Sequence, residues 1–399
     1  MSVRADPPAV LLGGEAIALS VARSLTHAGV EVHAFGHYQD PLRHSRARAS
    51  FTAFGDSSNV RARWLSALER GPSGAVIIPC SDDGLEMVAR NRESLVELGY
   101  VPVETSGEAV LAMLDKAETY ELARGAGIAA PRTATLASEE DAAEVIDRVP
   151  PPWALKPLHA HHFAHHFGLR KKAFIVRDVE ELRGALGRTS GLGFAMMLTE
   201  IIPGPDHAFE SYYSYLDAEG EPLFEFTKRK LRQYPTGFGL GTLHQTDWNP
   251  EAAELGLRFF RAAGIRGLAS VEFKRDSRDG QLKLIECNYR FTAATQLLRR
   301  AGLDLPVFVY DRALARPRRE FGRYRTGVSL WYPVEDTRAF LDYRRRGELT
   351  FGQWARSLAR RQHFPVASWR DPLPAVVRHG RMVARRLPQA ARSGRRLKP

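Results

Sequence analysis

Two glutamates on neighbouring segments of the chain, Glu272 and Glu286, have the residue type and spacing of a metal-binding pair. Each lies in a short apolar, strand-like run, and the polar residues 274–280 between the runs end in a glycine that suits a hairpin turn. On paired strands the two carboxylates and the amide oxygen of Asn288 can converge. Such hard oxygen ligands suit Mg²⁺, which combines carboxylates with substrate phosphates. The alternative is that both glutamates are solvent-facing strand residues.

Two lysines upstream, Lys116 and Lys156, have the character of phosphate ligands. Lys116 follows a predicted helix over 106–114, and Lys156 ends a predicted strand over 153–157, so regular structure positions both side chains. A lysine ammonium neutralises phosphate oxygens as a point charge. The two lysines therefore extend the predicted metal site towards a nucleotide.

A predicted strand over 196–202 ends in a Pro-Gly-Pro hinge. The backbone of such a hinge can hydrogen-bond an adenine edge, while Glu200 accepts a hydrogen bond from a ribose or amino group. More positive charge follows near the acidic pair, from Lys228, Arg229, Lys230 and Arg232. Phosphates, a divalent metal and basic side chains together are typical of phosphoryl transfer, in which the protein positions groups and neutralises charge.

The first 100 residues predict a doubly wound α/β sheet. A buried strand over 9–12, a Gly13-Gly14 turn, a helix over 17–28 and a strand over 30–35 form a βαβ unit. The turn lacks a G-x-G-x-x-G pattern, which disfavours dinucleotide binding. A second strand, 75–79, is followed by polar residues and a helix over 88–98. The polar residues either cap that helix or contact a ligand, with capping favoured: Ser81, Asp82 and Asp83.

The ordered set of these motifs resembles the ATP-grasp superfamily. The matching elements are Asp115-Lys116, Lys156-Pro157, Thr199-Glu200-Ile201-Ile202-Pro203-Gly204, Glu272 and Glu286-x-Asn288-x-Arg290. Each motif is weak by itself, but their order over roughly residues 10–310 is specific. The body is most similar to the carboxylate–amine ligases of the superfamily, including D-aspartate ligases and the ATP-grasp domains of the carbamoyl-phosphate synthase large subunit.

The resemblance implies a fold of the α/β plus α+β class. A pre-ATP-grasp, Rossmann-like domain covers residues 1–115, and a two-subdomain ATP-grasp module covers 116–315, with a flexible lid near 158–170. A basic, largely helical C-terminal segment, 316–399, lies beyond the resemblance.

The resemblance also implies roles for individual residues. Lys116 and Lys156 bind the α- and β-phosphates of ATP. Adenine and ribose are bound by Glu200, Ile201, Ile202 and His207. Two Mg²⁺ ions, with Mn²⁺ as an alternative, are held by Glu272, Glu286 and Asn288. The catalytic group comprises Arg290, which stabilises the transferring phosphoryl group or the tetrahedral intermediate, and Lys230 or Arg229 beside the γ-phosphate.

The activity implied is a Mg²⁺-dependent ligase. ATP activates a carboxylate as an acyl phosphate, and an amine then attacks to give an amide, ADP and phosphate. Two alternatives stay open: a kinase of the same fold that phosphorylates a small molecule, and a non-catalytic ATP-binding scaffold. The sequence does not identify the carboxylate or the amine, and a homo-oligomer is an open alternative to a monomer.

The predicted lid departs from the family pattern, which is rich in Gly and Ser. Here it contains Gly168 as its one glycine, and five histidines: His159, His161, His162, His165 and His166. The favoured interpretation is a mobile lid with incidental histidines. The others are histidines that bind phosphate or substrate, and a transition-metal or phosphohistidine site.

Composition and charge divide the chain into two parts. Residues 312–399 carry 22 Lys and Arg against 6 Asp and Glu, whereas the remainder carries 35 against 40. The basic segment predicts one of three roles: a solvated or partner-binding helix, contact with an anionic membrane or an acidic partner, or nucleic-acid binding, which no motif supports. Only two cysteines, no signal-like N-terminus and no membrane-length apolar run predict a cytoplasmic protein, with peripheral contact at the inner face of the membrane as an alternative.

Overall fold

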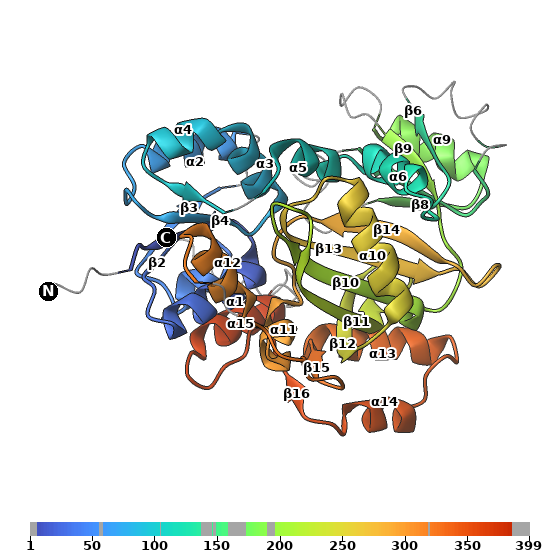
Figure 1. Cartoon of the computed structure of the whole chain (residues 1–399). Helices are drawn as coiled ribbons and strands as arrows, with labels where there is room; N and C mark the ends of the chain where they lie inside the picture. Colours follow the sequence, from blue (N-terminus) through green and yellow to red (C-terminus); the bar gives the residue numbers. More distant parts are fainter. Residues whose placement is uncertain are drawn as a thin grey trace, which may run out of the picture.

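The part of the chain that the structure describes folds into three β-sheets with helices packed on them (Figure 1). The computed structural model describes residues 6–55, 59–103, 105–136, 146, 149–158, 173–189, 196–317 and 320–384. The mixed α/β class predicted from the sequence is confirmed. The predicted His-rich lid lies outside the described residues.

The N-terminal sheet is parallel and has the strand order β3-β2-β1-β4-β5. Its strands are β1 (Ala9–Leu12), β2 (Val32–His37), β3 (Ser50–Phe54), β4 (Val76–Pro79) and β5 (Val101–Pro102). The helices of this part are α1 (Glu15–His27), η1 (Pro41–His44), α2 (Val60–Leu68), α3 (Asp82–Arg90) and α4 (Arg92–Glu97). Because apolar clusters cover both faces, β1 and β4 are wholly buried. The strand order reverses between β1 and β4, where ligands of such sheets bind.

The turns at this switch point use the glycines and the capping serine that the sequence indicates. Gly13 and Gly14 both have positive φ, 68° and 96°, and a Cβ on Gly13 would lie 2.3 Å from Ser81 Oγ. The Ser81 hydroxyl accepts a hydrogen bond from Gly84 N at 3.1 Å, which confirms the predicted cap. The single helix predicted over 88–98 is wrong, because Asn91 leaves helical geometry and divides α3 from α4.

The second sheet is small and antiparallel, with the order β6-β9-β7-β8. Its strands are β6 (Thr133–Leu136), β7 (Trp153–Pro157), β8 (Phe174–Val176) and β9 (Met196–Glu200). Among the described residues, the helices next to it in sequence are α5 (Gly107–Leu114), α6 (Lys116–Gly125) and α9 (Val179–Gly187). Its core is a separate cluster that includes Trp153, Leu155 and Leu198.

The third sheet has seven strands in the order β14-β13-β10-β11-β12-β15-β16. They are β10 (Phe209–Leu216), β11 (Pro222–Tyr234), β12 (Leu240–Asp247), β13 (Gly267–Arg275), β14 (Leu282–Asn288), β15 (Ser329–Trp331) and β16 (Gln362–His363). The neighbouring helices are η2 (Asp206–Ala208), α10 (Pro250–Ala262), α11 (Thr295–Ala301) and α12 (Leu305–Ala313). Helix α10 covers one face, where Phe260 packs on Tyr212 (Figure 1).

The basic C-terminal part joins this third sheet rather than standing apart. Strand β15 pairs antiparallel with β12, so strands on both sides of residue 315 share one sheet; the predicted domain boundary there stays a prediction. Helices α13 (Pro333–Arg345), α14 (Phe351–Leu358) and α15 (Leu373–Ala384) follow. Gly347, with a φ of 73°, lies between α13 and α14. No helix within the described residues is both long and apolar enough to cross a membrane.

One buried carboxylate ties the C-terminal part to the sheet. Asp336 of α13 is fully buried and accepts hydrogen bonds from Arg232 Nε at 2.8 Å and Arg232 Nη2 at 2.9 Å. Its other donors are the Thr242 hydroxyl and the indole N–H groups of Trp331 and Trp354. The predicted positive charge of Arg232 is therefore neutralised within the fold and does not reach the acidic pair.

We expect Asp336→Ala to destabilise the protein by about 3–5 kcal/mol, because it leaves a buried guanidinium without its counter-charge. Asp342→Ala on the same helix is the control, since Asp342 pairs with a largely exposed Arg345 and should cost about 1 kcal/mol or less. Urea unfolding measures both free energies. Equal losses in the two variants would contradict the assignment.

Candidate active site

A row of polar side chains crosses the third sheet. Glu286, Glu272, Ser211, Lys228 and Thr246 are successive register partners on β14, β13, β10, β11 and β12. Because side chains alternate between the faces of a strand, directly paired residues point to the same side. The five residues thus form one line on the face opposite α10. The predicted convergence of the two glutamates on a hairpin is present in the structure.

Lys230 lies on the same face and pairs with Glu272. Its ammonium is 2.8 Å from Glu272 Oε1 and 3.7 Å from the centre of the Phe209 ring. Its side chain is almost entirely buried, and that of Glu272 is mostly buried. Like charges directly opposite each other destabilise a sheet, so this lysine offsets the repulsion between Glu272 and Glu286. The site thus holds a buried ammonium group directly beside the carboxylates.

Lys228 is a second buried lysine of the row. Its Nζ donates to Ser211 Oγ at 3.0 Å and lies 3.4 Å from His244 Nδ1. Burial lowers the pKa of Lys228, and the nearby carboxylates of Glu272 and Glu210 oppose that shift. Burial, helped by the two lysines, holds the pKa of His244 well below its usual value, so this imidazole is neutral at pH 7. The cationic character of the row thus resides on the lysines.

The acidic end of the row has a donor set suited to a hard cation. The Asn288 amide nitrogen donates to Glu286 Oε1 at 2.6 Å, so the amide oxygen is not the atom used in that contact. Within the described ranges, no group of three or more His, Cys, Asp and Glu residues is placed to hold a metal. Two carboxylates and one amide instead fit Mg²⁺, which takes further ligands from substrate phosphates and water.

Arg290 connects the end of β14 to the N-terminal sheet. Its Nε donates to Asp82 Oδ1 at 2.6 Å, and one terminal nitrogen donates to the Phe291 carbonyl at 3.1 Å. Burial works to lower the pKa of Arg290, but the Asp82 carboxylate outweighs it and raises the value. Asp82 opens helix α3 directly after β4, so the contact reaches the switch point of the first sheet.

Arg229 is not brought together with the other predicted catalytic residues. It lies between Lys228 and Lys230 on β11 and therefore points to the opposite face of the sheet. There its Nε lies 3.0 Å from Asp247 Oδ2. Its register partner Glu210 is also on this face, where burial raises the pKa of the carboxyl to about 7 against the pull of Arg229.

The two predicted phosphate lysines lie on different elements. Lys116 is the first residue of α6, whose cap Asp115 accepts hydrogen bonds from Ala117 N and Glu118 N. Helix α6 is fixed to the site strand, because the Tyr120 hydroxyl donates to Ile285 O at 2.8 Å. Lys156 lies in β7 of the second sheet.

The predicted adenine hinge already makes several contacts within the protein. Glu200 is buried at the end of β9, accepts a hydrogen bond from Arg132 N at 3.0 Å and pairs with Arg278 at 2.5 Å. The Ile201 N–H donates to Pro152 O at 3.1 Å, and Ile202 O accepts from Lys274 Nζ at 2.8 Å. These contacts fix the hinge to strand β13.

The remaining hinge residue, His207, is exposed in η2. Its neighbour Asp206 accepts hydrogen bonds from Gln233 at 2.7 Å and from the Tyr343 hydroxyl at 2.5 Å. The hinge is therefore tied to β11 and to α13 as well.

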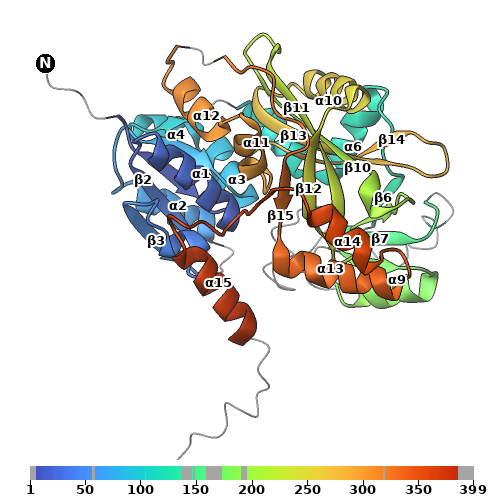
Figure 2. The ribbon, with the colours of Figure 1, turned by 90° about the horizontal axis from the view of Figure 1, so that it is seen from below.

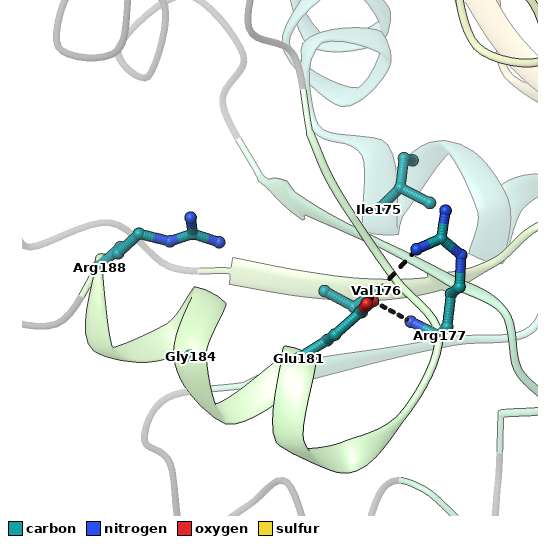
Figure 3. Close-up of a pocket in the computed structure, with 6 residues that line it drawn as sticks. All are labelled: Ile175, Val176, Arg177, Glu181, Gly184 and Arg188. Carbon is teal, nitrogen blue, oxygen red and sulfur yellow. Dashed lines mark hydrogen bonds and ion pairs between the residues drawn. The ribbon is translucent and has the colours of Figure 1, made fainter.

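A surface cavity on the second sheet lies apart from these residues. It is formed by β8 and α9 and lined by Ile175, Val176, Arg177, Glu181, Gly184 and Arg188 (Figure 3). Arg177 and Glu181 bond to each other there, through Arg177 N at 2.9 Å and the guanidinium at 3.4 Å. None of the predicted site residues lines this cavity.

Several residues of the site were not singled out from the sequence. Ser211, His244 and Lys274 join the row or the hinge, and no motif marks them. One signal was present for part of this arrangement: the period of two along β11 separates Arg229 from Lys228 and Lys230. His244 was out of reach because strand β12 was not predicted.

Comparisons with known proteins show which proteins this chain resembles. No family model matches the chain. The chain is 27% identical over 286 residues to a D-aspartate ligase of Enterococcus faecium (strain Aus0004), covering 68% of this chain and 67% of that protein.

Two solved structures share the fold. One is the biotin carboxylase domain dimer of Hydrogenobacter thermophilus 2-oxoglutarate carboxylase, in complex with MgADP, ADP and bicarbonate. It has a TM-score of 0.61 and 19% identity, over 81% of this chain and 74% of that one. The other is an L-amino acid ligase of Bacillus licheniformis, with a TM-score of 0.58 and 13% identity, over 79% and 76%.

These matches first define a class: a mixed α/β protein with the ATP-grasp fold. Within that class, the chain is similar to a D-aspartate ligase and shares its fold with an L-amino acid ligase. The resemblance predicted from the sequence is confirmed at this level.

The pKa of Glu210 gives a test of the face behind the row. A carboxyl with a raised pKa stabilises the fold when protonated, and this contribution is lost as the pH rises through about 7. We therefore expect the free energy of unfolding of Glu210→Gln, relative to that of the wild type, to increase as the pH rises from about 5 to about 8. Urea unfolding of both proteins at the two pH values measures the difference. A difference that does not change with pH would contradict the assignment.

Proposed function

We propose that the protein is an ATP- and Mg²⁺-dependent ligase that activates a carboxylate as an acyl phosphate for attack by an amine. The products are an amide, ADP and phosphate. The observation that carries this proposal is the pairing of Glu272 with Glu286 beside the buried Lys230. This arrangement provides oxygen ligands and positive charge side by side, as nucleotide phosphates require.

ATP would lie between the second and third sheets. Lys116 and Lys156 would bind its α- and β-phosphates. The hinge at Glu200, Ile201 and Ile202 would hold the adenine and ribose, beside the contacts that the Glu200 carboxylate already makes with Arg132 and Arg278. His207, exposed next to the hinge, would face the ribose.

Glu272, Glu286 and Asn288 would hold Mg²⁺, with two ions as the proposed number and Mn²⁺ as a substitute. The bound ion supplies charge neutralisation of the phosphates. Glu272 and Glu286 would hold the positive charge of the ion at the end of the row, next to Lys230.

The reaction then needs two displacements. A carboxylate oxygen of the substrate attacks the γ-phosphorus, and the bond to the bridging oxygen of ADP breaks. The amine nitrogen next attacks the acyl carbon, the bond to the phosphate oxygen breaks, and the nitrogen loses a proton. Lys230 and Lys228 would neutralise the transferring phosphoryl group.

Arg290 would stabilise the oxyanion of the tetrahedral intermediate formed in the second displacement. Asp82 fixes its guanidinium and so acts as a positioning residue. Because this contact comes from the N-terminal sheet, the acceptor amine would enter between the first and third sheets.

Assay of ADP release with a panel of amino acids tests the activity, since the names of two similar proteins specify amino-acid ligases. We expect ADP only when a carboxylate substrate is present, and an amide product by mass spectrometry when an amine is added. Hydroxylamine in place of the amine should trap the acyl phosphate as a hydroxamate.

Glu286→Gln should abolish ADP release, whereas Glu254→Gln, an exposed glutamate of α10, should not. A phosphoester product would support the kinase alternative instead. ATP binding without turnover over the whole panel would support the scaffold.

Neighbouring basic residues of β11 give a matched pair of variants. We expect Lys230→Met to lower the rate of ADP release by about a hundredfold or more, since it removes a charge beside the acidic pair. Arg229→Met should have a small effect, because Arg229 faces Asp247 on the other side of the sheet. Thermal unfolding checks that both variants are folded. Equal rate losses would contradict this division of the two faces.

A further inference from the structure

An exposed apolar ridge lies at the start of helix α15, remote in sequence from the proposed site. Trp369 is 101% exposed, Leu373 52% and Val376 63%. Leu373 and Val376 are three residues apart in α15 and therefore lie on one side of the helix, and Trp369 lies in the turn just before it. Large apolar side chains are rarely left this open in groups, and such groups mark binding surfaces.

The ridge stands on a segment that is fixed to the N-terminal part of the chain. Buried Asp371 accepts hydrogen bonds from Arg23 Nε at 3.0 Å, Ser45 Oγ at 2.6 Å and Arg46 N at 3.1 Å. Arg23 also donates to Val366 O at 2.8 Å. The exposure of Trp369 is therefore built into a held turn and does not come from a loose end of the chain.

Helix α15 itself is also anchored at two further points. Arg381 donates to Gln39 O at 3.0 Å, and Arg378 pairs with Glu335 of α13 at 2.9 Å. Figure 2 shows α15, in dark red, running outward from the five-stranded sheet. The ridge is thus presented on the outside of the molecule.

The segment that carries the ridge is strongly basic in sequence. Residues 356–381 contain six arginines and one acidic residue, Asp371, whose carboxylate is buried against Arg23 and Ser45. Arg360, Arg361 and Arg370 are exposed. The segment therefore combines outward-facing positive charge with an apolar ridge that contains a tryptophan.

We propose that this ridge docks the protein on an anionic lipid bilayer. Tryptophan is favoured at the boundary between head groups and acyl chains, and a helix with an apolar side and arginines binds in the plane of that boundary. Basic residues next to it are attracted by anionic head groups. Three side chains are too few for the core of a stable protein interface, and nucleic acid offers no apolar layer for Leu373 and Val376.

Co-sedimentation of the full chain with vesicles tests the proposal. The probes are vesicles of phosphatidylcholine with phosphatidylglycerol, and vesicles of phosphatidylcholine alone. We expect binding to the anionic vesicles, weakened by salt, and a blue shift of tryptophan fluorescence. Trp369→Ser combined with Leu373→Ser should weaken the binding by about tenfold or more. Trp248→Ser, which changes an exposed tryptophan elsewhere, is the matched control and should bind as the wild type does.

Two results would overturn the proposal: failure of the wild type to sediment with anionic vesicles, or equal binding by the double variant. Binding to a nucleic acid without any binding to vesicles would also overturn the proposal and would favour a polyanion partner. The double variant should keep the ADP-forming activity of the wild type, so the outcome is independent of the proposed reaction.

Discussion

The site depends on one constraint, the antiparallel register of four strands. Side chains of directly paired residues point to the same face, so β14, β13, β10 and β11 bring Glu286, Glu272, Ser211 and Lys228 into one row. A shift of one residue in any strand would turn its member of the row towards α10. The apolar face under that helix, where Tyr212 packs on Phe260, therefore fixes the chemistry of the opposite face.

The charged residues of the row stabilise one another, and contacts beside the row hold the surrounding elements together. Two buried lysines and two neighbouring carboxylates are costly apart and stabilise each other together, as the contact between Lys230 and Glu272 shows. Contacts at the ends of the row then tie the sheets to one another. Arg290 reaches Asp82, which opens the helix after strand β4 of the first sheet, and Lys274 reaches the hinge that follows the second sheet. The arrangement joins three sheets around one polar surface.

Local patterns in the sequence predicted the parts of the site that lie within single elements. The hairpin bearing Glu272 and Glu286, the cap at Ser81 and the helix over 106–114 follow from turn residues, capping residues and apolar spacing. The placement of Arg229 opposite Lys230 was within reach of the same reasoning, through the alternation of β11.

Contacts between distant segments could not be predicted in this way. The pairing of Asp336 with Arg232 joins residues 104 positions apart, and that of Arg23 with Asp371 joins residues 348 apart. Such contacts depend on how the sheets pack, which no local pattern records. For the same reason the sequence predicted a uniformly basic C-terminal segment. In the structure several of its arginines bond within the protein, such as Arg378 with Glu335.

We propose that the acidic pair and its lysines form a nucleotide–metal site. Calorimetric titration with a non-hydrolysable ATP analogue, with and without Mg²⁺, tests it most directly when Glu286→Ala is measured beside the wild type. We expect Mg²⁺-dependent binding by the wild type that the variant loses. Binding that is unaffected by Mg²⁺ and by the substitution, or no binding by the folded wild type, would contradict it.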